Sequence, residues 1–175
     1  MMRKFFLLVM LFSSSGARLF AAEALLEYQI KAVCVLNATR FVSWPTAAFG
    51  SPDSPLLVGV LGDNPFGSSL EDAVKGETVQ QRRIVVRQVS LKEAATVQVL
   101  FISHSERDHI EHILQALGDS SVLTISDIDQ FTQNGGMLGL GLARGKIRFE
   151  VNADAASRAQ LKISSQFLLL ARNAR

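Results

Sequence analysis

The chain contains a single cysteine, Cys34, and it therefore cannot form a disulfide bond within itself. No histidine or other base lies close to Cys34 in the sequence, so nothing nearby would activate its thiol. We expect it to be a small buried hydrophobic residue in a helix, on the same core-facing side as Ile30 and Val33. The fold must then be stabilised by its hydrophobic core alone.

Long apolar runs are scarce as well. Residues 5–12 form an apolar run of eight, whereas a helix that spans a bilayer needs roughly 20. Two basic residues precede this run and small residues follow it, which is the layout of a secretory signal peptide. We therefore predict that residues 1–22 are a signal peptide, cleaved after Ala17 or after Ala22. Residues 23–175 would then form one periplasmic domain without a transmembrane span.

Without the signal segment, the chain has no excess of charge of one sign. Three of the 18 basic residues lie in that segment, so 15 remain to face 16 acidic ones and the formal net charge changes from +2 to −1. Arg82, Arg83 and Arg87 form only a small basic patch, which has too few charges to follow a phosphate backbone. The composition gives no support for a nucleic-acid partner.

The usual fingerprints of catalysis and of cofactor binding are missing. The chain has no G-x-G-x-x-G, G-x-S-x-G or H-E-x-x-H, and the loop from Gly62 to Gly67 is followed by Ser68, where a phosphate-binding loop needs lysine. His104, His109 and His112 lie in one stretch, but a metal site requires three or four ligands held in fixed geometry. We interpret them as a solvated helix face. The sequence therefore predicts a protein that is not an enzyme and that uses no cofactor or metal.

Short apolar segments alternate with amphipathic ones along the chain. Strands are predicted over 56–61, 83–89, 97–103 and 122–125, helices over 23–43, 106–117 and 164–171, shorter helices ending near 74, over 127–133 and from 152, and a hairpin of 137–143 and 147–151 joined by 144–146. Alternating strands and helices favour parallel pairing through right-handed crossovers. We therefore predict an α/β fold, a Rossmann-like single-domain sandwich with a mainly parallel sheet and a C-terminal antiparallel hairpin.

Polar residues follow three of the predicted strands. Because the carboxyl ends of parallel strands meet at one edge of an open sheet, where ligands bind, these residues form a candidate ligand or partner site. They are Asp63, Asn64, Ser103, His104, Ser126 and Asp127. Arg40 and Trp44, at the end of the first helix, are added because arginine and tryptophan often anchor interfaces. The alternative for Trp44, the sole tryptophan, is a core position under that helix.

The order and spacing of these segments resemble the YfiR-type family of periplasmic proteins over about residues 28–171. The matching segments are YQIKA (28–32), FVSWP (41–45), LGDNPFG (61–67), VLFIS (99–103), VLTISD (122–127), Phe131, GGM (135–137), IRFEVN (147–152) and LKISS (161–165). The resemblance implies an α/β sandwich that dimerises and has no catalytic residues. Some members carry redox-responsive disulfides, with a cysteine where this chain has Val97, so the resemblance does not extend to an internal disulfide switch.

The best understood proteins of that type repress a membrane-bound diguanylate cyclase by binding its periplasmic domain, which lowers cyclic-di-GMP and biofilm formation. The leading hypothesis is therefore a non-catalytic regulator, a likely homodimer in the sense that the resemblance implies one, whose partner is the periplasmic part of an inner-membrane signalling protein. The alternative is a periplasmic protein that binds a small solute, and it predicts loss of binding when Asp63, Ser103 or Asp127 is changed.

Overall fold

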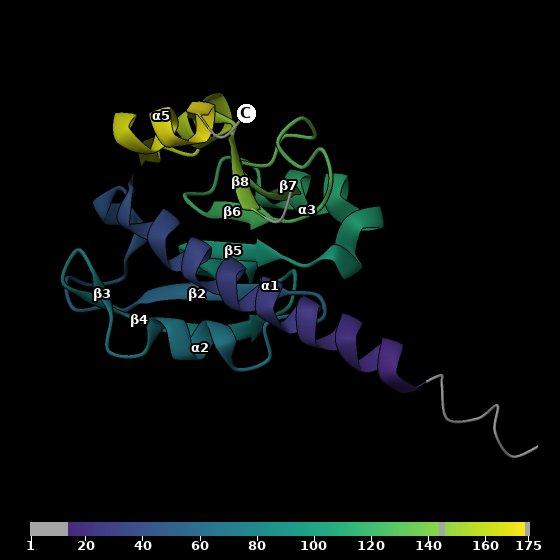
Figure 1. Cartoon of the computed structure of the whole chain (residues 1–175). Coiled ribbons are helices and arrows are strands. Elements are labelled where there is room, and N and C mark those ends of the chain that lie inside the picture. The colour runs from purple at the N-terminus through teal and green to yellow at the C-terminus, as the bar shows by residue number, and fades with distance from the viewer. Residues whose placement is uncertain (1–13, 144–145, 174–175) are drawn as a thin grey trace, which may run out of the picture.

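The computed structural model describes residues 14–143 and 146–173, and seven strands within them form one sheet (Figure 1). These strands are β2 (Leu56–Leu61), β3 (Thr78–Val79), β4 (Arg82–Val89), β5 (Val99–Ile102), β6 (Leu123–Ser126), β7 (Leu138–Ala143) and β8 (Lys146–Val151). Their order in the sheet is β3-β4-β2-β5-β6-β7-β8. The five inner strands are parallel, and β3 and β8 are antiparallel edges. The predicted α/β sandwich with a C-terminal hairpin is confirmed.

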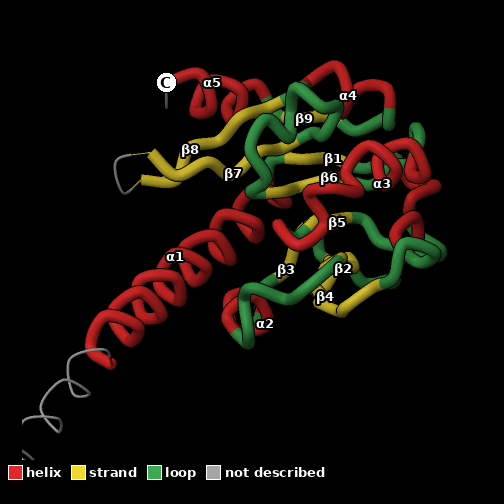
Figure 2. Tube along the Cα trace, turned by 90° about the vertical axis from the view of Figure 1, so that its right-hand side faces the viewer, coloured by secondary structure: helices red, strands yellow, loops and turns green. Residues whose placement is uncertain are grey.

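Helices cover both faces of the sheet (Figure 2). They are α1 (Ser14–Arg40), α2 (Ser69–Val74), α3 (Ile110–Leu117), α4 (Ala153–Arg158) and α5 (Ser165–Asn173), with short 3-10 turns at Thr46–Ala48, Ala94–Thr96 and His104–His109. One core lies between the sheet and α1, α2, α4 and α5, and the second lies under α3. Every residue of β5 and β6 is buried, which explains why these strands have no polar face in the sequence.

A second sheet of two short strands closes the first core. β1 (Val42–Ser43) pairs antiparallel with β9 (Lys162–Ile163), and the rings of Phe41 and Phe167 stack with their centroids 5.2 Å apart. This contact brings the C-terminal region next to the end of α1. Strands of two residues have no periodic pattern, so the sequence did not predict them.

Three predicted elements differ from the structure. The first helix ends at Arg40 rather than at 43, because Val42 and Ser43 are drawn into β1. It also extends back to Ser14, whereas residues 1–13, with the apolar run of the predicted signal, lie outside the described residues. The predicted helix at 127–133 is a series of turns, because Gln130 adopts a left-handed backbone conformation (φ 58°) that a helix excludes. Within the predicted helix 106–117, the first part is a 3-10 turn.

The hairpin of β7 and β8 forms as predicted, from Leu138 opposite Val151 to Ala143 opposite Lys146. Its predicted connection includes Arg144 and Gly145, which lie outside the described residues. β8 is an edge strand, as its alternating pattern indicated.

Candidate functional site

Asp127 lies directly after β6 and beneath α1, where its side chain is only 4% exposed. Its Oδ2 accepts hydrogen bonds from Lys31 Nζ at 2.6 Å and from the Tyr28 hydroxyl at 2.8 Å. Lys31, itself 5% exposed, also contacts Glu27 Oε1 at 2.5 Å. A charge buried this deeply is stable only when it is paired, so the two donors from α1 keep the carboxylate ionised and hold the helix on the sheet.

Tyr28 takes part in this cluster as a neutral donor. Burial, and then its hydrogen bond to Asp127 and the negative charge of that carboxylate, raise the pKa of the Tyr28 hydroxyl well above its ordinary value. Its ring packs edge-on against Phe66 with centroids 5.6 Å apart, and the Lys31 ammonium lies 4.5 Å from the ring centroid. Asp127 Oδ1 is buried and has no hydrogen-bond partner within the described residues.

The loop after β2 satisfies its own polar groups. Asn64 Oδ1 accepts from Phe66 N at 2.9 Å and its Nδ2 donates to Gly67 O at 3.2 Å, which is the turn chemistry expected of asparagine. The Asp63 N–H donates to Ser105 Oγ at 2.9 Å. Ser105 is a residue that the sequence analysis missed, because it lies 42 positions away and in no motif.

Of the six strand-end residues, the two serines are buried and the two loop residues are exposed. Ser126 Oγ donates to Ile102 O at 2.7 Å and accepts from Ile128 N at 3.1 Å, and Ser103 N donates to Leu61 O at 2.9 Å. These bonds connect neighbouring strand ends. His104 is exposed, as are Asp63 and Asn64. The edge therefore combines fixed interior groups with a polar outer surface.

Trp44 occupies the core position that was its alternative. It is 8% exposed, and its Nε1 donates to Gln98 O at 3.0 Å. The Gln98 side chain in turn accepts from Leu57 N at 2.9 Å and donates to Ala48 O at 2.7 Å. Trp44 is thus part of the packing between the end of α1 and the sheet, and its role as a surface anchor is corrected.

Arg40 remains at the surface. It pairs with Glu77 Oε2 at 2.5 Å, and both side chains are nearly half exposed. An exposed pair of this kind contributes at most about 1 kcal/mol to stability, so Arg40 is available to a partner at little cost.

One apolar surface was assigned to the wrong side of the first helix. Leu26, Ile30 and Val33 are 58%, 45% and 49% exposed, and their spacing of four and three residues places them on one face of α1. The residues of α1 that do face the core are Ala32, Val35, Leu36 and Ala38. We call Leu26, Ile30 and Val33 the α1 face. Cys34 beside it is half-buried, and burial raises the pKa of its thiol.

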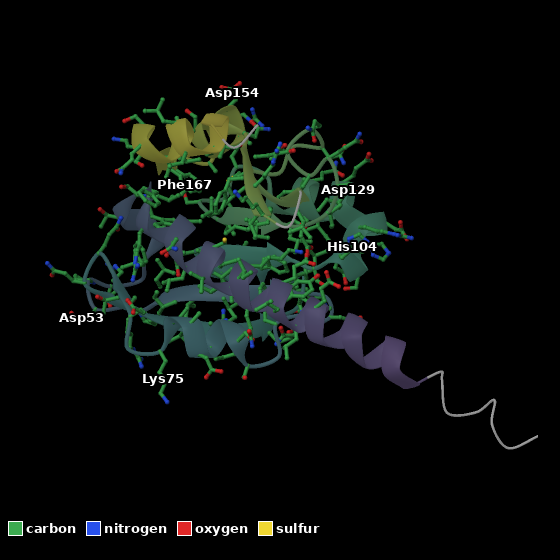
Figure 3. The ribbon with its side chains drawn as sticks, viewed as in Figure 1. Asp53, Lys75, His104, Asp129, Asp154 and Phe167 are labelled. Atoms are coloured by element: carbon green, nitrogen blue, oxygen red, sulfur yellow. The ribbon has the colours of Figure 1, made fainter. Side chains whose placement is uncertain are left out.

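The three histidines do not gather into a metal site. In the part of the chain that the structure describes, there is no group of three histidine, cysteine or acidic side chains placed to hold a metal ion. His109 Nδ1 lies 3.2 Å from Glu106 Oε2 on an exposed turn, and His104 lies away from the sheet (Figure 3). Nor does any helix within the described ranges combine the length and apolar character needed to cross a membrane.

These features define a single α/β sandwich domain whose candidate residues form surfaces rather than a deep cleft. The sequence profile of the family described as YfiR/HmsC-like matches residues 28–172, and the chain belongs to that family. Membership supports a general role as a periplasmic regulator of cyclic-di-GMP signalling that acts on a membrane signalling protein. The family is known for regulators without catalysis.

A solved structure is similar in fold. It is the crystal structure of a conserved domain protein from Vibrio cholerae O1 biovar El Tor strain N16961, with a TM-score of 0.51 and 13% identity. The alignment covers 66% of this chain and 53% of that chain, so it spans about half of the other protein. At this identity the likeness shows the fold alone. No curated protein matches the chain.

Proposed function

We propose that the exported domain binds the periplasmic part of an inner-membrane diguanylate cyclase and holds it inactive, which lowers cyclic-di-GMP. The family match over residues 28–172 carries this proposal. The strand-end edge supports it, because the buried serines there are occupied by backbone partners and the exposed groups form an outer surface. Such a surface suits binding to a protein better than conversion of a substrate.

We assign the exposed residues Asp63, Asn64 and His104 to the surface that contacts the cyclase. They lie on two neighbouring strand ends, and the Asp63 N–H bond to Ser105 fixes the two loops relative to each other at 2.9 Å. A prearranged surface loses little conformational entropy on binding. Repression requires that the domain bind the inactive cyclase more tightly than the active one, by about 1–3 kcal/mol of coupling.

The same regulator is proposed to be a homodimer through the α1 face. Glu23 and Arg40 extend that face at its two ends, with Asn37 between Val33 and Arg40, so the exposed positions 23, 26, 30, 33, 37 and 40 follow the i+3 and i+4 spacing of one helix side. If two copies of α1 pack antiparallel, Ile30 of one lies opposite Val33 of the other, and Glu23 lies opposite Arg40. Both the apolar and the charged residues are then complementary to themselves, as a two-fold interface requires.

Cyclic-di-GMP in a deletion strain tests the function. The strain is complemented with the full gene, with a version lacking residues 2–22, or with the charge reversal Asp63→Arg. Asp53→Arg is the matched control, because Asp53 is exposed at the opposite end of the molecule from His104 (Figure 3). We expect deletion to raise cyclic-di-GMP, and the full gene and the Asp53→Arg variant to restore it, whereas the other two do not. No change on deletion, in cells that express the protein, would contradict the proposal.

A further inference from the structure

A cavity of about 190 Å³ opens between the C-terminal end of α3, the start of β6 and α4. It exists because β7 pairs only with the second half of β6, where Ile125 lies opposite Leu138 and Ser126 opposite Gly139. The first half of β6 has no β7 residue beside it. The Met137 N–H donates to Thr124 Oγ1 at 3.1 Å instead of to a neighbouring strand, and α4 covers the gap only in part. We call this space the α3–α4 pocket.

The walls of the α3–α4 pocket are mainly apolar and belong to the core. They are formed by Leu114, Leu117, Val122, Met137 and Ala155, with the buried Thr124 among them. Thr124 Oγ1 accepts from Met137 N, and its own proton has no acceptor among the described residues. The pocket therefore offers an apolar interior with one hydroxyl donor.

The rim of the α3–α4 pocket carries charges of both signs. Asp119 and Arg158 line it, both are exposed, and neither forms an ion pair with another residue in the described ranges. Asp119 follows α3 directly, at the negative end of the helix, so this side of the rim favours a cation. The Arg158 guanidinium favours a carboxylate, which it can bind with two parallel hydrogen bonds.

The size of the pocket sets the class of ligand. An apolar cavity of about 150 Å³ holds one benzene molecule, whereas pockets for drug-sized ligands and cofactors occupy roughly 300–1,000 Å³. A space of about 190 Å³ thus accepts a branched aliphatic group, and a nucleotide would not fit. We propose that the α3–α4 pocket binds a small zwitterion with an apolar side chain, an aliphatic α-amino acid of the size of leucine.

In this arrangement the side chain fills the apolar interior, the ammonium group faces Asp119 and the carboxylate faces Arg158. The site is separate from the strand-end surface, because it lies at the start of β6 and the strand-end residues follow its end. The proposal does not rest on repression of a cyclase. It can hold if the regulator function fails, and the reverse is also true.

Nuclear magnetic resonance of the isotope-labelled protein, purified after export, tests this proposal with three probes. They are L-leucine, 4-methylpentanoate, which lacks the ammonium group, and 3-methylbutylamine, which lacks the carboxylate. We expect L-leucine to shift the amides of residues 117–124 and 155–158 in a saturable way, with a dissociation constant on the order of millimolar. Loss of either charged group should weaken binding about tenfold or more.

Variants separate a specific site from chance association. Arg158→Gln and Asp119→Asn change exposed side chains, so the fold is retained, and each should weaken L-leucine binding about tenfold. Ala155→Leu should fill the pocket and abolish binding. The proposal is overturned if L-leucine gives no saturable shift up to about ten times the expected dissociation constant, or if Arg158→Gln and Asp119→Asn bind it as the unchanged protein does.

Discussion

The Lys31 ammonium lies 2.6 Å from Asp127 Oδ2, and both side chains are almost fully buried. This ion pair joins the first helix to the end of a central strand 96 residues later in the chain. The Tyr28 hydroxyl donates to the same oxygen, so one carboxylate binds two side chains from successive turns of α1. The position of α1, and with it the exposed α1 face, depends on this contact.

Removal of the Lys31 charge should be costly. In Lys31→Met the Asp127 carboxylate remains buried with only Tyr28 as donor, and we expect the free energy of unfolding to fall by about 3–5 kcal/mol. The double variant Lys31→Met with Asp127→Asn should be more stable than the single one, because it leaves no unpaired buried charge. Urea denaturation measures both.

Arg40→Gln is the control for the Lys31 prediction. It breaks an ion pair with Glu77 that is also 2.5 Å long but exposed, and the loss should stay below about 1 kcal/mol. Equal losses for Lys31→Met and Arg40→Gln would show that burial of the Lys31–Asp127 pair has no energetic role.

The hydroxyl of Tyr28 should make stability depend on alkaline pH. Its pKa is raised in the folded protein, by burial first and then by Asp127, so the folded state keeps a proton that the unfolded state loses. The stabilising contribution is therefore complete below the unfolded pKa of about 10 and is lost as the pH rises above it. Tyr28 is the only tyrosine, so tyrosinate absorbance reports this residue alone. We expect that absorbance to appear above the ordinary range and together with unfolding, and ionisation near pH 10 in the folded protein would contradict the assignment.

Gly62 should tolerate no side chain. Its φ of +87° is unfavourable for other residues, and an added Cβ would lie 2.5 Å from Ser105 Oγ and 2.8 Å from Glu106 Cγ. Gly67, in the same loop, has a φ of +56° but no atom within 4 Å of such a Cβ. Thermal unfolding should show a loss of about 1–2 kcal/mol for Gly67→Ala, from the backbone alone, and a clearly larger loss for Gly62→Ala. Similar losses would mean that the contact with Ser105 relaxes freely.

The sequence predicts the sheet better than it predicts the surfaces. The strand 56–61 is recognisable because a segment covered on both faces is apolar throughout, and this does not depend on which element covers it. α1 has apolar residues on more than one side, and the sequence alone does not tell which side is covered. Ile30 and Val33 were therefore assigned to the core that small residues such as Ala32 and Ala38 occupy. The contact of Lys31 with Asp127 has no local signal, because it depends on how α1 crosses the sheet.

The α1 face should determine the oligomeric state. An exposed apolar stripe on a helix is stabilised when a second copy buries it, and each large aliphatic side chain contributes about 1.5–3 kcal/mol when fully buried. Ile30→Glu places a charge at the centre of this contact, so sedimentation should show a monomer where the unchanged protein is a dimer. Gln29→Glu adds the same charge to an exposed neighbour outside the stripe and should leave the dimer intact. The antiparallel arrangement makes a sharper prediction: Glu23→Arg and Arg40→Glu should each weaken the dimer, because like charges then face each other, and the double variant should restore it. A parallel arrangement would place Glu23 opposite Glu23, and the double variant would then give no recovery.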